Sequence, residues 1–244
     1  MKEPVKALLW DKDGTLVDSL EQWVARDRRL LQMLCRKLDI PEADHAAAVA
    51  AGLAAIGVRE EGIDPRGEIA RGTEASIAAA MAGALSAFGQ LPSPEAFASL
   101  VGGFIGDILA SDKTPAPLRR GIHALLTEAA KRRIIQGLAS SDSRKSCLKE
   151  LSAHGIVTFF TFFAFGDEVP RAKPDPWCVE RFSKEIAIPP SQILVIGDAP
   201  TDEEMATAAG AQFCALLGGA GAREDFSDRC IVAGHPDEIL SLLG

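Results

Sequence analysis

The chain has 244 residues, of which 47% are hydrophobic and 25% are charged, so it can form one large domain or two modest ones around a sizeable core. Its formal net charge of −8 argues against nucleic-acid or membrane partners, since nucleic acids and anionic membranes both require a basic surface. The densest basic runs, residues 26–29 and 131–133, are interpreted as solvated helix faces. No apolar run approaches the roughly 20 residues needed to span a bilayer.

The start of the chain and its cysteines indicate the compartment. Residues 1–4 lead directly into a short apolar stretch, without a charged leader and a long apolar region, so we expect no signal peptide. The five cysteines are scattered and form no CxxC pair, and an odd number fits reduced thiols. We therefore expect a cytoplasmic protein, and a monomer or a homodimer.

The first predicted element is a buried strand over residues 5–10, followed by an acidic turn that contains glycine. Residues 19–112 are rich in alanine, leucine and glutamate and show no strand signal of comparable strength. We predict a helical module there, with helices at 75–88 and 93–109. Residues 113–117 are expected to be a connector.

Strands and helices alternate through the rest of the chain. This alternation predicts a parallel sheet with helices on both faces, to which the first strand also belongs. The predicted fold class is therefore α/β, with a helical insertion after the first strand. The predicted helices are 121–132, 143–154, 176–185 and 202–209, the strands are 134–139, 159–165, 193–196 and 212–217, and a closing strand and helix are expected in 230–244.

Ligands of open parallel sheets bind beyond the carboxyl ends of the strands, so chemistry is expected there. The first strand ends in Asp11-Lys12-Asp13-Gly14-Thr15. Residues two apart in an extended segment point to the same side, so Asp11 and Asp13 can face one site. Two adjacent carboxylates need a cation or a shared proton, and a hard ion such as Mg²⁺ would satisfy them.

The second strand ends near Ser140 and Ser141. A hydroxyl or a backbone N–H group here can bind an anionic oxygen, although a plain helix N-cap is the alternative. Further along, Lys173 precedes a proline, and its ammonium group can neutralise phosphate charge; a surface lysine is the alternative.

The strand at 193–196 is followed by Asp198 and, four residues later, by Asp202. Asp198 can add a third carboxylate to the ion site, and Asp202 can support it from behind. An acidic helix N-terminus is the alternative for either residue. The glycine-rich stretch 218–221 lacks the spacing of a nucleotide-binding loop and predicts a plain turn.

The order and spacing of these motifs resemble the four motifs of the haloacid dehalogenase superfamily. The matching segments are DKDGTLVDS, Ser140, GDEVPRAKP and VIGDAPTDEEMATAAGA, and the resemblance extends from Val5 to about Gly221. The subgroup most resembled holds phosphoglycolate phosphatases and β-phosphoglucomutases. The resemblance implies a Rossmann-like core, residues 1–18 and 113–244, with an inserted α-helical cap domain, residues 19–112.

The resemblance also implies roles for individual residues. Asp11 would attack phosphorus and form an aspartyl-phosphate, and Asp13 would act as general acid and then as general base. Ser140 and Lys173, with Ser141, would hold the phosphoryl group. Mg²⁺ would be bound by the Asp11 side chain, the Asp13 backbone carbonyl and the Asp198 side chain, with Asp202 in support.

Asp13 and two departures from the family pattern refine this expectation. Dehalogenases of the superfamily lack an acid at the position of Asp13, and phosphonate-cleaving relatives have a small residue there, so Asp13 indicates phosphate esters. Trp10 stands where phenylalanine is commoner, and no functional consequence is expected. Residues 118–121 replace the usual PGV-like turn out of the cap, which can alter the hinge but not the chemistry.

Specificity in such proteins usually depends on the cap. By its place, the segment 70–74 is expected to be the cap loop that faces the active site, with Arg71 and Thr73 as candidate substrate-binding residues. A helix-start turn capped by Thr73 is the alternative. The sequence thus predicts a Mg²⁺-dependent phosphatase for a small phosphorylated metabolite, similar to phosphoglycolate phosphatase. A phosphosugar mutase and a non-catalytic phosphometabolite-binding protein remain alternatives.

Overall fold

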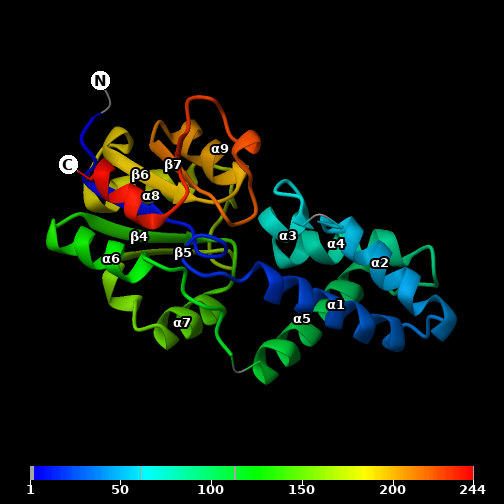
Figure 1. The fold of residues 1–244 in the computed structure, drawn as a ribbon. Helices are drawn as coiled ribbons and strands as arrows, with labels where there is room; N and C mark the ends of the chain where they lie inside the picture. Colours follow the sequence, from blue (N-terminus) through cyan, green and yellow to red (C-terminus); the bar gives the residue numbers. More distant parts are fainter. Residues whose placement is uncertain (1–2, 61, 113, 244) are drawn as a thin grey trace. The chain divides into compact units, whose positions relative to one another are not determined.

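The computed structural model describes residues 3–60, 62–112 and 114–243. By its internal contacts the chain divides into two compact units, Met1–Ser19 with Ala116–Gly244, and Leu20–Pro115 (Figure 1). The module boundaries expected from the sequence, 18/19 and 112/113, lie close to these divisions. Lys113, at which the expected connector begins, lies outside the described residues.

A six-stranded, entirely parallel sheet forms the centre of the discontinuous unit. Its strands are β1 (Ala7–Trp10), β4 (Ile135–Ser140), β5 (Phe162–Phe165), β6 (Ile193–Gly197), β7 (Gln212–Leu216) and β8 (Ile231–Ala233). The strand order is β5-β4-β1-β6-β7-β8, so β1 lies between β4 and β6. Trp10 is in register with Leu138 on one side and with Ile196 on the other. The predicted α/β fold with a parallel sheet is confirmed.

The two faces of the sheet bury separate apolar clusters. In β1, Leu8 and Trp10 belong to one cluster, and Ala7 and Leu9 belong to the other, as the alternation of side chains along a strand requires. Because both faces are covered, the strand sequences are continuously apolar. The first cluster is covered by α6 (Ile122–Lys131), α7 (Arg144–Ala153) and α10 (Pro236–Ile239), and the second by α8 (Trp177–Ile186) and α9 (Pro200–Ala209).

The edge strand β5 is shorter than the prediction of 159–165. The amides of Phe159 and Phe160 donate to the carbonyls of Ile156 and Val157, at 3.1 and 3.2 Å, and so form a 3₁₀ turn. Pairing with β4 therefore starts only at Phe162, which lies opposite Gly137. The 3₁₀ helices of the chain are Glu42–Asp44, Val157–Phe159, Pro190–Gln192, Arg223–Asp225 and Leu240–Leu242.

The second unit is built from helices around its own apolar core, which includes Leu34, Leu53, Met81 and Phe97. Its helices are α1 (Leu20–Lys37), α2 (His45–Ala55), α3 (Glu68–Arg71), α4 (Glu74–Leu85) and α5 (Pro94–Ser111). The unit also contains one short strand pair that the sequence did not indicate. A short antiparallel ladder joins β2 (Val58–Arg59) and β3 (Gly62–Ile63), and two residues per strand are too few to produce a periodic signal.

Side-chain caps mark the start of α4 and α5, the two helices that the sequence predicted for this unit. Ser93 accepts a hydrogen bond from the amide of Ala96 at 3.3 Å, and Pro94 occupies the first helical position of α5. Thr73 caps α4 in the same way. Among the described residues, no helix combines the length and the apolar character that a membrane crossing requires.

Candidate active site

The predicted motifs lie at the carboxyl ends of four neighbouring strands. Asp11 follows β1, Ser140 ends β4, Asp198 follows β6, and Lys173 lies in the segment after β5. Because β4, β1 and β6 are adjacent in a parallel sheet, their carboxyl ends open at one edge. The topology alone therefore brings the motif residues to one side of the sheet.

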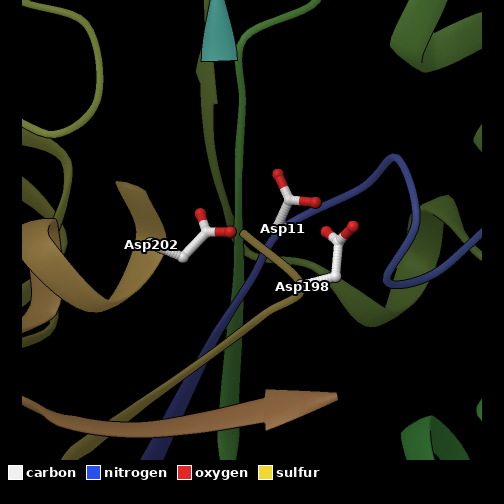
Figure 2. Close-up of side chains that lie close together, drawn as sticks. All are labelled: Asp11, Asp198 and Asp202. Atoms are coloured by element: carbon white, nitrogen blue, oxygen red, sulfur yellow. The ribbon is translucent and has the colours of Figure 1, made fainter. Parts of the chain in front are cut away.

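Three carboxylates form the centre of the site. Asp11, Asp198 and Asp202 each offer an oxygen atom, and these atoms lie within 4.8 Å of one another (Figure 2). The Asp11 side chain is 12% exposed and that of Asp202 is 2% exposed. Figure 2 shows the three carboxylates turned toward a common point. Such an all-oxygen set has the donor chemistry of a site for a hard divalent cation.

Lys173 provides the cation of this cluster. Its Nζ lies 2.6 Å from Asp11 Oδ1 and 2.7 Å from Asp202 Oδ1, and the side chain is 6% exposed. Burial alone would lower the pKa of Lys173, but the two carboxylates outweigh burial and raise it above its usual value. Lys173 is therefore protonated, and it is not the surface lysine of the alternative interpretation.

One ammonium group does not balance three buried carboxylates. Burial, followed by the charges of Asp11 and Asp202, raises the pKa of Asp198 well above its usual value. Burial also raises the pKa of Asp11 to about 6, although Lys173 opposes this. The buried carboxylates thus repel one another and hold protons more tightly than usual, and a divalent cation bound between them would compensate their charges when they ionise.

The loops after β1 and β7 hold Asp198 in place. Thr15 Oγ1 donates to Asp198 Oδ1 at 3.0 Å, and the amide of Ala220 donates to Oδ2 at 2.6 Å. Gly14 has a φ of +78°, and a Cβ atom there would lie 2.1 Å from Asp198 Oδ2. A Cβ atom at Gly219 would meet the same oxygen at 2.1 Å. Both glycines are needed because the backbone approaches the carboxylate so closely.

The turn at 218–221 therefore does more than the plain turn that the sequence predicted. Its contribution to the site is a backbone amide, which residue type does not reveal. Only its position in the sequence could have indicated this contribution, because the turn follows the carboxyl end of β7, the strand next to β6.

Asp202 has two sets of contacts. Its Oδ1 accepts from Lys173, and its Oδ2 accepts from the amide of Ala199 at 3.3 Å at the start of α9. Asp202 thus stabilises a helix N-terminus and also lies within the carboxylate cluster. The sequence predicts a supporting position for Asp202, and one of its oxygens lies within 4.8 Å of an oxygen of Asp11 and of Asp198. Its supporting role remains a prediction.

Asp13 lies beside this cluster and has its own donors. Its Oδ1 accepts from Ser19 Oγ at 2.6 Å and from Lys12 Nζ at 2.8 Å. Its side chain is 23% exposed, compared with 12% for Asp11 and 2% for Asp202. Its assignment as acid, base and backbone metal ligand remains a prediction.

Ser140 and Ser141 lie where β4 ends, and Ser140 is 6% exposed. The Oγ of Ser140 accepts from the amide of Asp142 at 3.1 Å. The N-cap of α7 is Ser143, whose side chain accepts from the amide of Ser146, so neither Ser140 nor Ser141 caps that helix. Their role in phosphate binding remains a prediction.

Arg71 and Thr73 belong to the helical unit. Arg71 ends α3 and pairs with Glu68 at 3.4 Å. Thr73 Oγ1 accepts from the amide of Ser76 at 3.3 Å, and the Ser76 side chain accepts from the amide of Thr73 at 2.9 Å, which completes a capping box. The alternative interpretation of Thr73, a residue that caps the start of a helix, is therefore present in the structure. Substrate binding by Arg71 or Thr73 remains a prediction.

Arg119 is a residue of the site's surroundings that the sequence did not reveal. Its guanidinium donates to the carbonyls of Gly14 and Leu217, and so it joins the loop after β1 to the end of β7. Arg119 lies in the segment 118–121, which departs from the family's usual turn. A charged residue in a segment that departs from the family pattern was the only feature of the sequence that could have indicated this role.

Comparison with known proteins supports the interpretation of the motifs. Residues 5–210 match the model of the haloacid dehalogenase-like hydrolases, a span that includes all the strand-end motifs. A phosphoglycolate phosphatase from Pseudomonas putida is 25% identical over 214 residues, which cover 88% of this chain and 70% of that protein. An N-acetylmuramic acid 6-phosphate phosphatase from the same organism is 22% identical over 242 residues, which cover 98% of this chain and 96% of that protein.

Solved structures share the fold. The crystal structure of a protein described as a predicted phosphoglycolate phosphatase from Haemophilus somnus 129pt superposes with a TM-score of 0.72 and covers 98% of each chain. At 20% sequence identity, this likeness supports the architecture and carries no information on substrate.

Proposed function

This chain belongs to the haloacid dehalogenase-like hydrolase family, and from that premise we propose that it is a Mg²⁺-dependent phosphatase that transfers the phosphoryl group of a small monoester to Asp11 and then to water. The observation that supports the proposal most strongly is the buried cluster of Asp11, Asp198 and Asp202 with Lys173. A nucleophilic carboxylate and a phosphate dianion repel each other, so their approach needs compensating positive charge.

The carboxylates of Asp11 and Asp198 are the groups that would hold the ion, with Asp202 close beside them. When bound, Mg²⁺ supplies positive charge next to the phosphoryl oxygens. Lys173 supplies a second positive charge, which is already fixed 2.6 Å from the nucleophile. An aspartyl-phosphate on Asp11 divides one difficult displacement into two easier ones.

Asp13 would protonate the leaving oxygen in the first step and take a proton from water in the second. General acid–base catalysis of this kind contributes about 10²–10⁴-fold. Ser140, Ser141 and the nearby backbone amides would bind the phosphoryl oxygens from the β4 side.

Small phosphorylated metabolites are the proposed substrate class, with 2-phosphoglycolate and sugar 6-phosphates as first candidates, because two similar proteins are named for such compounds. Arg71 and Thr73 are proposed to contact the part of the substrate that leaves. No structural observation favours a phosphosugar mutase or a non-catalytic binder, and both remain outcomes of the test.

The test is release of inorganic phosphate from a panel of phosphorylated metabolites, including a hexose 1-phosphate, with Mg²⁺ or with a chelator. We expect release only with Mg²⁺ and a loss of at least about 10³-fold in Asp11→Asn, which removes the nucleophile. The matched control is Asp228→Asn, an exposed aspartate of the same unit, which should keep full activity.

Conversion of the hexose 1-phosphate to an isomer without phosphate release would indicate a mutase. Absence of both reactions from folded wild-type protein with Mg²⁺ would contradict an enzymatic role.

A further inference from the structure

Lys12, between the two aspartates of the first motif, is a buried cation. The residue is 1% exposed, although lysine is among the residues least often buried. Its ion-pair partners are three carboxylates that differ from those of Asp11, Asp198 and Asp202. Lys12 Nζ is 2.8 Å from Asp13 Oδ1, 2.7 Å from Glu150 Oε2 and 3.3 Å from Asp142 Oδ2.

Glu150 anchors this lysine to the body of the α/β unit. It lies in α7 and its side chain is 11% exposed. Its second oxygen, Oε1, accepts from the amide of Ala116 at 3.0 Å, and the carbonyl of Ala116 contacts His154 Nε2 at 2.7 Å. Lys12 is thus tied through Glu150 both to α7 and to the residue at which the chain re-enters the α/β unit.

A buried ammonium group cannot leave such a network without a large free-energy cost, since an unpaired buried charge is strongly destabilising. Glu150 and Asp142, which lie outside the loop that carries Asp11 and Asp13, therefore help to fix the position of Nζ. Lys12 and Ser19 donate to the same oxygen of Asp13, Oδ1. Two donors on one oxygen, at 2.8 and 2.6 Å, restrict the rotation of the carboxylate about its Cβ–Cγ bond.

We propose that Lys12 is a positioning residue that, anchored by Glu150, holds the Asp13 carboxylate in the orientation for proton transfer with the leaving oxygen and with water. This inference rests on the proposed function, in which Asp13 is the acid and base. Lys12 itself does not touch the substrate. A purely structural role of the same ion pairs would affect stability and leave the chemistry of Asp13 unchanged.

Leaving-group chemistry separates the two roles. An alkyl phosphate needs a proton on its leaving oxygen, which Asp13 would supply, whereas p-nitrophenolate departs without one. In both cases Asp13 would assist the attack of water on the aspartyl-phosphate. Misplacing Asp13 should therefore slow phosphoryl transfer from an alkyl phosphate selectively, and should slow dephosphorylation with either substrate.

The experiment compares wild type with Lys12→Met, Glu150→Gln and the double variant, on the best alkyl phosphate and on p-nitrophenyl phosphate. Asp13→Asn gives the full loss of acid and base, and Lys184→Met, an exposed lysine of α8, is the matched control. For Lys12→Met we expect kcat/KM to fall about 10–100-fold on the alkyl phosphate and less than about threefold on p-nitrophenyl phosphate. A burst of p-nitrophenolate should appear as dephosphorylation becomes rate-limiting.

Glu150→Gln keeps an acceptor for the Ala116 amide and lowers the excess negative charge, so it should fold even if Lys12→Met does not. It should change the ratio of the two kcat/KM values in the same direction by a smaller factor. An unchanged ratio in the folded variants, with only the unfolding free energy lowered, would overturn the proposal. Wild-type protein that hydrolyses neither ester would overturn the proposed function and this inference with it.

Discussion

Asp27 is a buried ionisable residue that lies outside the catalytic loops and affects the stability of the fold. The residue is 6% exposed and lies on the face of α1 that also buries Leu30, Leu31 and Leu34. Burial raises the pKa of Asp27 to about 7, and the charge of Arg26 opposes this only in part. Between about pH 4 and pH 7, the folded state therefore holds a proton that the unfolded chain releases.

Asp27→Asn should stabilise the protein at high pH. Because the folded pKa is raised, wild type loses stability as the pH rises through this window, whereas the neutral amide does not. The expected gain in the free energy of unfolding is absent near pH 4 and grows up to pH 7. Above pH 7 it is constant, at most about 4 kcal/mol. Urea unfolding at pH 5 and pH 8 measures it, with Asp107→Asn, an exposed residue of α5, as control. An equal effect at both pH values would contradict the assignment.

The prediction that this residue lies on a solvated helix face was wrong, and the reason is geometric. The sequence predicts a solvated helix face for residues 26–29, and Arg28 and Arg29 are exposed. A helix turns 100° per residue, however, so four consecutive residues cannot all face solvent, and one of them points toward the core. Which of the four is buried depends on the helices packed against α1, and this is not visible in a charge count.

Arg119 links two elements of the site. It donates to the carbonyl of Gly14 in the loop after β1 and to that of Leu217 at the end of β7. These loops carry the groups that approach Asp198, which include the amide of Ala220. The guanidinium therefore holds together the two sides of the pocket in which Asp198 lies.

Arg119→Met should lower both stability and metal affinity. It leaves two partly buried carbonyls without their donor, at about 1–3 kcal/mol each, and it frees the loops around Asp198. We expect a lower free energy of unfolding and weaker Mg²⁺ binding, measured by urea unfolding and by calorimetric titration. Arg120→Met, the exposed neighbour, should change neither. Unchanged metal affinity in a destabilised Arg119→Met variant would restrict Arg119 to a role in stability.

Elements with strong periodicity were predictable, whereas the loop contacts were not. The parallel sheet and its covering helices follow from the alternation of apolar runs after residue 118, and each strand of this unit was expected close to its place. The shortened β5 and the hairpin of β2 and β3 depend on a few backbone hydrogen bonds, which leave no periodic signal. The Arg119 contacts depend likewise on two carbonyl groups.

At the scale of the whole molecule, the spacing of motifs along the chain was sufficient to predict that distant aspartates meet. Asp11 and Asp198 are separated by the entire helical unit and most of the sheet, yet they follow neighbouring strands. The balance of charge among them could not be predicted, because it depends on which carboxylates Lys173 contacts. That balance links metal binding to the stability of the fold.

Mg²⁺ should stabilise the protein more strongly as the pH rises. Burial raises the pKa of Asp11 from 3.8 to about 6, so without metal its contribution to stability falls as the pH rises through that window. Metal binding requires the deprotonated carboxylates, so the stabilisation by Mg²⁺ grows over the same window. At 100 times its dissociation constant, the ion would add about 2.7 kcal/mol to the free energy of unfolding.

Thermal unfolding with Mg²⁺ or with a chelator, at pH 5 and pH 7.5, tests this linkage. We expect a small rise in Tm at pH 5 and a larger one at pH 7.5. Asp198→Asn removes a carboxyl group whose pKa burial raises, so without metal it should be more stable than wild type at pH 7.5, and it should lose most of the response to Mg²⁺. Asp228→Asn should respond as wild type does. An equal response of Asp198→Asn and wild type would place the ion elsewhere, whereas a response that does not depend on pH would mean that Asp11 is already ionised at pH 5.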